Sequence, residues 1–323
     1  MDRVIPAPAV RRAEHLSPDQ VEQVLALMRA AGDTDGALPL SEHVVLHLRH
    51  GGEVPAVHLL AYDEAQGQIV GYAHVDTTDA VEGASAELVV HPLHRRRGLG
   101  RALVTAAMAV ADERNDGRLR LWAHGDHPSA SALAIRLGFD RARVLLQLRR
   151  SLFAPLDEVV LPAGVHLRAF RPGADDEAWL ALNAAAFAEH PEQGKWTLDD
   201  LHVRIREPWF EAAGFLLAES DDGRLLGFHW TKVHGEEHAN PHEDGEPHAR
   251  EPIGEVYVLG VAPDATGGGL GRALTLAGLW HLRDRGLAQV MLYVDESNTR
   301  ALALYQRLGF VRWSNDVSFQ RTL

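Results

Sequence analysis

The spacing of apolar residues along the chain predicts one series of elements that occurs twice. Apolar residues at helical spacing predict a helix early in each half, at residues 18–30 and 174–187. Apolar runs predict three strands after each helix, at 57–63, 69–76 and 86–90, and at 215–219, 225–233 and 255–262. A glycine-rich turn, an Ala/Leu-rich helix, a further strand and a short helix ending in Leu-Gly-Phe complete each half. The pattern predicts two domains of the α/β (α+β) class.

The segments around the two glycine-rich turns form an internal repeat. VVHPLHRRRGLGRAL (89–103) aligns with GVAPDATGGGLGRAL (260–274), and LWAHGDHPSASALAIRLGF (121–139) aligns with LYVDESNTRALALYQRLGF (292–310). Both pairs align at one offset of 171 residues, from 89 to 260 and from 121 to 292, which indicates a duplication. The expected N-terminal domain is 1–150, the linker, which contains two prolines, is 151–164, and the C-terminal domain is 165–323.

Composition and charge exclude several classes of function. The chain has 323 residues, of which 46% are hydrophobic and 24% are charged, as in folded globular proteins. No apolar run approaches the roughly 18–20 residues that a membrane span needs, and the first ten residues do not read as a secretory signal. There is no cysteine, which excludes disulfides and thiolate metal sites, so we expect a cytoplasmic protein. The net charge of −13 argues against nucleic acid as a partner and suits a small cationic amine. We expect a monomer.

The turn after the third strand of each half can hold a phosphate group. In the first half it carries Arg95, Gly98 and Gly100 in the pattern R-x-x-G-x-G, directly before a helix. Glycines let backbone N–H groups converge on a ligand, and the start of the helix adds unpaired donors and partial positive charge. The turn is neither a Walker loop nor a dinucleotide-binding fingerprint, because the lysine of the one and the third glycine of the other are missing. A plain connector is the alternative, which the recurrence of the turn in matching context disfavours.

These turns and the Leu-Gly-Phe endings resemble the Gcn5-related N-acetyltransferase (GNAT) superfamily, whose pyrophosphate loop has the consensus [QR]-x-x-G-x-[GA]. The resemblance implies two tandem domains, each with a mixed, mostly antiparallel central sheet flanked by helices. It also implies acetyl-CoA as co-substrate, bound in a cleft between two central strands. The second copy departs from the consensus, because Thr266 stands where Gln or Arg is usual. Backbone groups would therefore hold the phosphates there.

Acetyl transfer to an amine favours a base and an acid in the site. An α-amine titrates near ~7.7–8.0 and is mostly protonated at neutral pH, while a departing thiolate with a pKa near ~8.5 benefits from an acid. The C-terminal half offers Glu255 before the glycine-rich turn and Tyr305 in the last helix, where the repeat places Ala84 and Ala134 in the first half. We therefore predict a catalytic C-terminal domain and a degenerate N-terminal one. In the alternative reading, Glu255 is an exposed strand residue and Tyr305 belongs to the core.

Further segments resemble a narrower family, the mycothiol synthases (mycothiol acetyltransferases). These segments are HPEQGKWT (190–197), EPWF (207–210), GFLLAE (214–219), GFHWTKVH (227–234), GEVYVLGV (254–261) and, near the N-terminus, DTDGALPLSE (33–42). The resemblance covers essentially the whole chain. That family transfers acetyl from acetyl-CoA to the cysteinyl amine of cysteinyl-glucosaminyl-inositol, the last step of mycothiol biosynthesis.

The family resemblance implies roles for individual residues. Glu255 would be the base, acting through water, and Tyr305 the acid toward the CoA sulfur. The residues that would contact the cysteinyl-sugar substrate are Asp35, Glu192, Lys232, Glu255 and Tyr293. Acetyl-CoA in the C-terminal domain would be held by Leu259, Gly260, Val261, Thr266, Gly267, Gly268, Gly269, Leu270, Gly271, Arg272, Asn298, Thr299, Arg300, Ala301, Leu302 and Ala303. A second, non-reacting acetyl-CoA in the N-terminal domain would be held by Leu88, Val89, Val90, Arg96, Arg97, Gly98, Leu99, Gly100 and Arg101.

Three of these residues also have alternative interpretations without a role in the site, and the function has alternatives too. Asp35 could cap a turn, Lys232 could be a solvated strand residue, and Glu192 could have no role. The competing functions are a tandem acetyltransferase for another small amine or a protein N-terminus, and an acetyl-CoA sensor without turnover. The presence of Glu255 and Tyr305 disfavours the sensor.

A histidine-rich segment, HGEEHANPHEDGEPHAREP (234–252), raises the question of a metal site. His234 and His238 have the spacing of one helical face, but Asn240-Pro241 excludes a helix there, and Gly, Glu and Pro dominate the segment. We interpret it as a solvated insertion between two strands and predict no metal.

Overall fold

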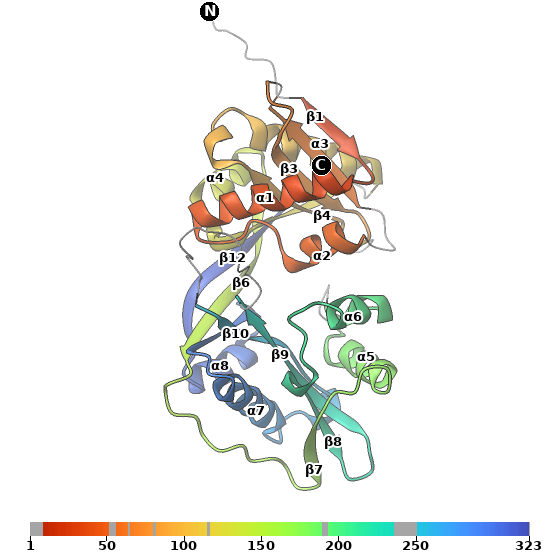
Figure 1. Ribbon diagram of the computed structural model, residues 1–323, viewed down its shortest axis with the longest axis vertical. Coiled ribbons are helices and arrows are strands. Elements are labelled where there is room, and N and C mark those ends of the chain that lie inside the picture. Colours follow the sequence, from red (N-terminus) through yellow and green to blue (C-terminus); the bar gives the residue numbers. More distant parts are fainter. Residues whose placement is uncertain are drawn as a thin grey trace, which may run out of the picture. The chain divides into compact units, whose positions relative to one another are not determined.

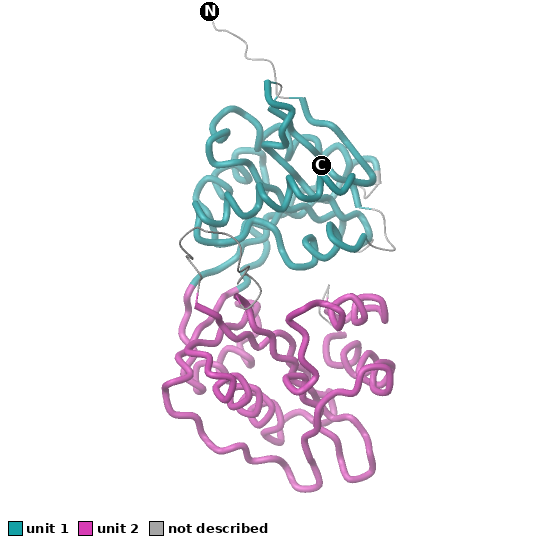
Figure 2. The backbone as a smooth tube through the Cα atoms, viewed as in Figure 1, with its two compact units in different colours: residues 1–145, 314–323 teal, residues 146–313 magenta. Residues whose placement is uncertain are grey.

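The chain folds into two compact units. The structure, a computed structural model, describes residues 9–51, 56–63, 65–79, 82–114, 117–188, 193–235 and 251–322. Residues 1–145 and 314–323 form unit 1, and residues 146–313 form unit 2 (Figure 2). This division differs from the bounds expected from the sequence, because the end of the chain belongs to unit 1 and residues 146–150 belong to unit 2.

The difference arises from two strands whose residues join the unit formed mainly by the other half of the sequence. β12 (Val311–Thr322) pairs antiparallel with β5 (Arg118–Ala123) of unit 1, with Val317 opposite Ala123 and Thr322 opposite Arg118. β6 (Asp140–Ser151) neighbours β11 (Gln289–Asp295) in the order of strands, and its residues from 146 on belong to unit 2. The alternation of side chains along a strand sets which face is buried, but it does not specify which distant strand will be the partner.

Unit 1 is a sheet with helices on both faces (Figure 1). Its remaining strands pair antiparallel in chain order, β1 (Val10–Ala13), β2 (Val57–Tyr62), β3 (Ile69–Asp76) and β4 (Ala84–Val90), and β4 then pairs in parallel with β5. The helices are α1 (Pro18–Asp35), α2 (Glu42–His50), α3 (Leu99–Arg114) and α4 (Pro128–Arg136). One hydrophobic cluster joins α3 and α4 to the sheet and a second joins α1 and α2 to it, so the two helix sets cover opposite faces.

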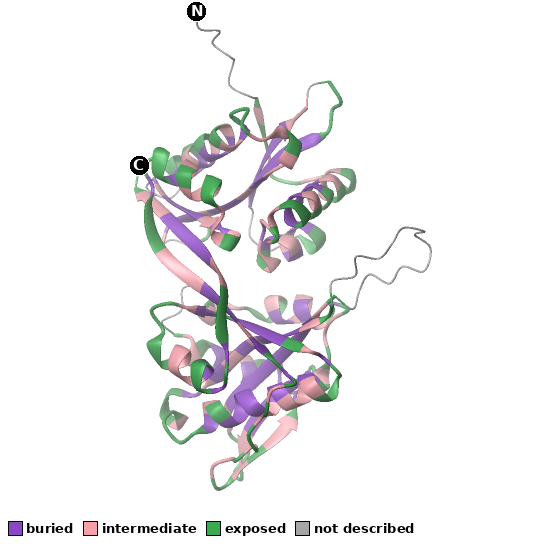
Figure 3. Ribbon diagram, turned by 90° about the vertical axis from the view of Figure 1, so that its left-hand side faces the viewer, coloured by how far each residue is buried: buried purple, intermediate pink, exposed green. Residues whose placement is uncertain are grey.

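Unit 2 repeats this arrangement. Antiparallel pairing joins β7 (Val165–Ala169), β8 (Phe215–Ser220), β9 (Leu225–His234) and β10 (Ile253–Val261), and β10 then pairs in parallel with β11. The helices are α5 (Asp176–Ala186), α6 (Leu198–Ile205), α7 (Leu270–Asp284) and α8 (Thr299–Arg307). One hydrophobic cluster involves α5 and α6 and another involves α7. The strands are largely buried, whereas the helices expose one side (Figure 3).

Local sequence explains where the elements begin and end. Ser17 starts α1 with a capping box, in which its side chain accepts from the backbone of Gln20 and the Gln20 side chain accepts from the backbone of Ser17. Gly36 ends α1 in the left-handed conformation, with φ of 77°. The predicted helices at 18–30 and 174–187 and the six predicted strands are confirmed. Short 3₁₀ helices complete the described elements: η1 (Pro92–His94), η2 (His124–Asp126), η3 (Gln193–Lys195), η4 (Ala212–Gly214) and η5 (Pro263–Ala265). Within the described ranges, no helix is long and apolar enough to cross a membrane.

Candidate active site

The two parallel strands at the centre of unit 2 part at their carboxyl ends. Parallel pairs join Gly254 to Val290 and end with Val256 opposite Leu292, although β10 continues to Val261. Backbone N–H and C=O groups of the residues beyond the last pair must bind water or a ligand on that side. The residues 259–261, expected to hold acetyl-CoA, lie on this diverging stretch. The opening at the carboxyl ends of parallel strands is a usual place for ligands in sheets of this kind.

A β-bulge marks the point of divergence. The register between β9 and β10 shifts between Val256 and Val258, so Tyr257 is an extra residue in β10. Such a bulge bends a strand and re-aims its side chains. In unit 1 the pairing of β3 with β4 continues from Asp76–Ser85 to Gly71–Val90 without a shift.

Because of this bulge, the alignment expected from the constant offset is wrong by one residue at Glu255. Glu255 faces Lys232 and Met291, and the matching positions of unit 1 place Ser85 opposite Asp76 and Arg120. The counterpart of Glu255 is therefore Ser85, not Ala84 as the constant offset predicted. The serine cannot accept a proton as a carboxylate can, so this position in unit 1 still lacks a base.

Glu255 lies buried on one face of the sheet beside two nitrogen-bearing side chains. It is 8% exposed, and its Oε2 lies 2.6 Å from Nε2 of His234. Lys232, on β9, lies directly opposite Glu255, and His234 follows two positions later on β9, so its side chain projects on the same face. The Lys232 ammonium lies 4.2 Å from the centre of the Trp209 ring and 5.3 Å from that of Tyr257, within the range of cation–π attraction. Glu255 is thus neither an exposed strand residue nor isolated.

Tyr293 lies on the same face, on β11. Met291 pairs with Glu255, and Tyr293 follows two positions later on β11. Its hydroxyl accepts a hydrogen bond of 2.6 Å from Nε2 of Gln147, and Gln147 Oε1 accepts one of 3.1 Å from Nε of Arg149. Since a guanidinium can only donate, the second bond fixes the orientation of the Gln147 amide. The phenolic oxygen therefore acts as an acceptor toward Gln147.

Tyr305 is suited to donate a proton. It lies on α8, 8% exposed, with its ring 5.6 Å from that of Phe310. Burial raises the pKa of the Tyr305 phenol to about 12, so the group keeps its proton throughout the neutral range. A protonated phenol can supply a proton to a developing thiolate.

The glycine-rich turn of unit 2 presents an open backbone. Gly267 and Gly269 adopt left-handed conformations, with φ of 94° and 86°, and a Cβ added at 267, 268 or 269 would meet no atom within 4 Å. α7 begins at Leu270, so its first N–H groups face the turn. The side chain of Thr266 donates to the Pro263 carbonyl at 2.9 Å. Backbone groups are therefore the main phosphate donors that this turn offers.

Two further segments of unit 2 contain residues expected at acetyl-CoA. Arg272 donates to Asp157 at 2.5 Å, in the segment that precedes β7. Asn298 caps α8, its side chain accepting from the backbone of Ala301 at 3.0 Å. Residues 298–303, expected at acetyl-CoA, thus form a second helix start in unit 2, exposed at 298–300 and partly buried at 301–303.

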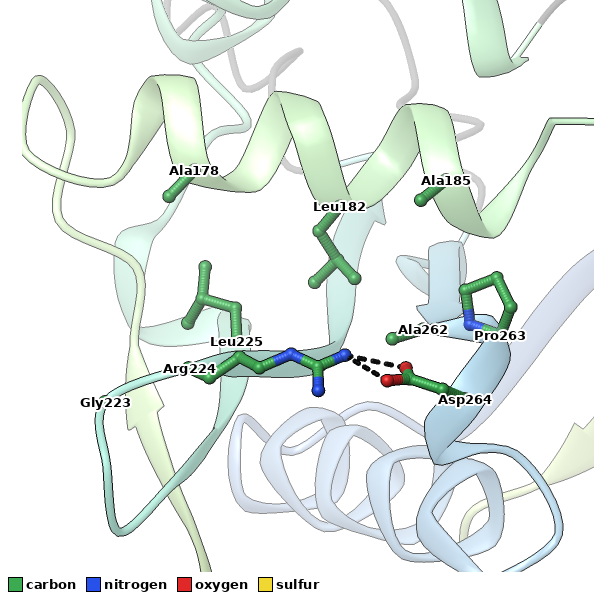
Figure 4. A pocket seen from close by; sticks show the side chains of 9 residues that line it. All are labelled: Ala178, Leu182, Ala185, Gly223, Arg224, Leu225, Ala262, Pro263 and Asp264. Carbon is green, nitrogen blue, oxygen red and sulfur yellow. Dashed lines mark hydrogen bonds and ion pairs between the residues drawn. The ribbon is translucent and has the colours of Figure 1, made fainter.

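A separate hollow in unit 2 contains none of the predicted site residues (Figure 4). It has a volume of about 420 Å³ and is lined by Ala178, Leu182, Ala185, Gly223, Arg224, Leu225, Ala262, Pro263 and Asp264. Arg224 donates to both oxygens of Asp264, at 2.7 and 2.5 Å. This ion pair attaches η5, which leads into the glycine-rich turn, to the turn between β8 and β9.

The corresponding turn of unit 1 is organised around an ion pair. Arg95 donates to both carboxylate oxygens of Asp35 at 2.7 Å, and its Nε donates to the carbonyl of Val90 at 3.2 Å. Arg96 and Gly98 adopt left-handed conformations, with φ of 64° and 86°, before α3. Asp35, expected at the amine substrate, therefore binds the consensus arginine of the phosphate loop.

Unit 1 also contains a buried ionic network that the sequence did not indicate. Glu87, in the last pair of β4 with β5, accepts from the backbone of Ser41 at 2.5 Å and from its hydroxyl at 2.7 Å, and lies 3.3 Å from His124. His124 lies 2.9 Å from Asp316 of β12. Burial alone would raise the pKa of Glu87, but the ion pair with His124 and the hydrogen bonds from Ser41 lower it to about 2. Burial alone would lower the pKa of His124, but the hydrogen bond to Asp316 and the nearby charges of Glu87 and Asp316 raise it to about 10. At neutral pH the network is an imidazolium between two carboxylates.

The structure thus brings together Lys232, Glu255 and Tyr293 and adds His234 and Gln147, which sequence reasoning did not assign to the site. His234 ends β9, so it belongs to a strand, although the sequence analysis counted it in the histidine-rich segment; the GFHWTKVH motif contained it without indicating its partner. Gln147 lay within the range assigned to the N-terminal domain. Glu192, His238, His242 and His248 lie outside the described residues. Among the residues that are described, no cluster of three or more His, Cys, Asp or Glu side chains could hold a metal ion.

Comparisons with known proteins confirm the fold class. Residues 178–310 match the acetyltransferase (GNAT) family, and residues 55–141 match an acetyltransferase (GNAT) domain. A tandem GNAT protein from the clavulanic acid biosynthesis pathway is 20% identical, with a TM-score of 0.71 and coverage of 97% of this chain and 98% of that one. A GCN5-related N-acetyltransferase from Sphaerobacter thermophilus is 23% identical, with a TM-score of 0.66 and coverage of 97% and 95%.

Curated relatives are similar over nearly the whole chain. The mycothiol acetyltransferase of Acidothermus cellulolyticus is 57% identical, covering 98% of this chain and 96% of that protein. The mycothiol acetyltransferase of Salinispora arenicola is 59% identical, covering 97% of each.

Proposed function

The chain belongs to the mycothiol acetyltransferase family, and we propose that unit 2 acetylates the cysteinyl amine of cysteinyl-glucosaminyl-inositol. An acetyl-CoA-dependent N-acetyltransferase follows from the family and from its two GNAT domains. The observation that carries the assignment of the reaction to unit 2 is the buried Glu255 on the site face, where unit 1 has Ser85.

The residues of unit 2 fit acetyl-CoA. The turn at 267–271 offers open backbone at a helix start, which favours a pyrophosphate. The diverging residues 259–261 offer backbone groups for the amide-bearing arm of the molecule. Acetyl-CoA supplies the acetyl group as a thioester. We propose the holding residues named from the family resemblance, with the hydroxyl of Thr266 directed to its own turn.

Glu255 and Tyr305 divide the proton transfers between them. The substrate amine is mostly protonated at neutral pH, and Glu255 removes a proton from it, directly or through one water. The neutral amine then attacks the thioester carbonyl. Tyr305, whose phenol is protonated throughout the neutral range, donates its proton to the sulfur as the carbon–sulfur bond breaks.

The amine side of the site combines charge with aromatic surface. Lys232 and Tyr293 present a cation and a half-exposed phenol on the face that carries Glu255. Hydroxyl-rich sugar and cyclitol rings suit such a mixture of donors and aromatic surface. We propose Lys232, Tyr293, Asp35 and Glu192 as substrate contacts on the family resemblance.

Unit 1 is proposed to hold acetyl-CoA without turnover. It retains the glycine-rich turn and the parting of its two parallel strands after Glu87 and Trp122. It has Ser85 and Ala134 where unit 2 has Glu255 and Tyr305, so neither of these two positions offers the group proposed for the proton transfer.

The test combines substrate identity with one substitution. Purified protein is mixed with acetyl-CoA and cysteinyl-glucosaminyl-inositol, and acetylated product and released CoA are measured by mass spectrometry and thiol titration. Glucosaminyl-inositol and an aminoglycoside serve as competing amines, because they would be preferred if the enzyme served another amine.

Glu255→Gln should lower kcat by roughly 10²–10⁴ while leaving acetyl-CoA affinity unchanged. Glu211→Gln, which alters an exposed carboxylate of unit 2, is the matched control. Activity of Glu255→Gln within threefold of wild type would show that Glu255 is not the base.

A further inference from the structure

We propose that His234 takes up the proton that Glu255 removes from the amine and passes it to water, so that Glu255 is restored in every turnover. The inference rests on the proposed function, in which Glu255 is the base. His234 acts through Glu255 and does not itself need to touch the substrate.

The geometry links the two side chains directly. Nε2 of His234 lies 2.6 Å from Oε2 of Glu255, slightly shorter than the ~2.7–2.9 Å of charge-assisted N–H···O hydrogen bonds, so the two groups are in direct contact. The pairing of β9 with β10 places His234 opposite Ile253 and Lys232 opposite Glu255, so the imidazole reaches the carboxylate from the adjacent position on the same face. This contact is built into the sheet and does not depend on a loop.

The difference in burial indicates the direction in which the proton moves, from Glu255 to His234 and then to water. The side chain of Glu255 is 10% exposed, whereas that of His234 is 35% exposed. Nε2 faces Glu255, which leaves Nδ1 on the other side of the ring. In the tautomer that carries its proton at Nδ1, the imidazole can accept the proton of Glu255 at Nε2 and release the Nδ1 proton to water; a tautomer change from Nε2 back to Nδ1 then readies the ring for the next turnover.

The proton balance of the reaction requires such an exit. A protonated amine and a thioester give an amide, a thiol and one proton: a carbon–nitrogen bond forms and the carbon–sulfur bond breaks. Of the two protons that leave the nitrogen, one returns to Tyr305 after the phenol has protonated the sulfur. The other arrives at Glu255 and must reach water before the next turnover. A carboxylate buried to this degree needs a partner with better access to solvent.

Two other neighbours on this face do not fit the role. The ammonium of Lys232, across the strand from Glu255, is already protonated and cannot accept a further proton. It lies against the ring of Trp209 and is 7% exposed, so it has less access to water than His234. Tyr293, on β11, carries a phenol, which does not accept a proton near neutral pH as an imidazole does.

The experiment uses the full-length protein with acetyl-CoA and cysteinyl-glucosaminyl-inositol. His234→Gln keeps a hydrogen-bond donor beside Glu255 but cannot relay a proton, and kcat should fall about tenfold, less than the loss for the base itself. The pH dependence of kcat should also change, because glutamine has no group that takes up and releases a proton as the imidazole does. The KM for acetyl-CoA should stay the same. In the double variant, Glu255→Gln should hide the effect of His234→Gln, because the two groups act in series.

Chemical rescue separates a relay from a supporting role. Adding imidazole to His234→Ala should restore part of kcat in proportion to the neutral form of imidazole, because the vacated position is partly open to solvent. The same addition should not help Glu255→Gln. His166→Ala, which removes an exposed histidine 3.5 Å from Glu219, should behave as wild type with and without imidazole. Acetyl-CoA affinity, measured by calorimetry, shows that each variant is folded.

The outcomes distinguish the inference from the function on which it rests. Full activity of Glu255→Gln overturns the assignment of the base. An inactive Glu255→Gln with His234→Gln within twofold of wild type at every pH overturns the relay alone. A loss in His234→Ala that imidazole does not restore, with an unchanged pH profile, shows that His234 only supports the shape of the site, and this also overturns the relay.

Discussion

Replacing His124 by glutamine should destabilise unit 1 severely, because it leaves two buried carboxylates without their cation. His124 lies 2.9 Å from Asp316 and 3.3 Å from Glu87, and all three side chains are at most 14% exposed. Glutamine can still form hydrogen bonds, so the substitution tests the charge more than the shape. Asp316 comes from β12, so the network also attaches the last strand of the chain to unit 1.

The magnitude follows from the linkage between pKa and stability. The pKa of His124 in the folded protein, about 10, lies above the ordinary value of 6.5. Its contribution is therefore fully present below about pH 6.5 and is lost as the pH rises through about 10. At pH 7, about three units below the folded value, the contribution is roughly 4 kcal/mol at ~1.4 kcal/mol per unit. This agrees with the ~3–5 kcal/mol that breaking a buried ion pair costs.

Glu87 gives the opposite dependence on pH. Its pKa in the folded protein, about 2, lies below the ordinary value of 4.5. Its contribution is present above about pH 4.5 and is lost as the pH falls through about 2. The difference in stability between wild type and His124→Gln should therefore be largest near pH 5–6.5 and should decrease toward pH 10.

Hydrogen exchange detected by mass spectrometry measures this effect in unit 1 alone. Peptides that cover β5 and β12 should exchange up to about 10³-fold faster in His124→Gln at pH 7, since ~1.4 kcal/mol is a factor of ten. Peptides from β8 in unit 2 are the internal reference. His43→Gln is the matched control, because it removes an exposed histidine 3.9 Å from Asp76, and such surface pairs contribute only ~0–1 kcal/mol. Exchange within threefold of wild type in β5 and β12 would refute the reasoning.

Three further predictions concern ligands and turnover. Gly271→Asp should abolish acetyl-CoA turnover, since it places a carboxylate at the open turn. Gly100→Asp should remove one of two bound acetyl-CoA equivalents and leave most activity. Calorimetry measures the bound equivalents and steady-state rates measure turnover, with Gly100→Ala as a control for packing. Gln147→Leu should raise the KM for the amine several-fold with little change in kcat, because Tyr293 loses its hydrogen bond; an unchanged KM would contradict a role for that phenol in substrate binding. Tyr305→Phe should lower kcat by less than Glu255→Gln does, because a thiolate is already a fair leaving group, and a loss confined to KM would exclude the phenol as the acid.

The partial prediction of the site has a physical explanation. Glu255 and Tyr305 could be singled out because the repeat provides a comparison inside the chain. Their partners could not, because a cross-strand contact such as that between His234 and Glu255 depends on register. The bulge at Tyr257 shows the limit most clearly, since one extra residue changes the counterpart of Glu255 from Ala84 to Ser85, whereas the two blocks aligned at the offset of 171 both follow the bulge and do not reveal it.

The sequence by itself determined the duplication, the order of elements, the two glycine-rich turns and the chemical groups available for acetyl transfer. These features are local: a helix, a strand or a turn is encoded by residues close together in the chain. Only the tertiary structure decided that β12 completes the sheet of unit 1, that Asp35 binds Arg95, and that Glu87, His124 and Asp316 meet in one buried network. Each of these contacts joins residues that are distant in the chain, and their partners are chosen by packing and charge in the folded protein, which no local pattern specifies.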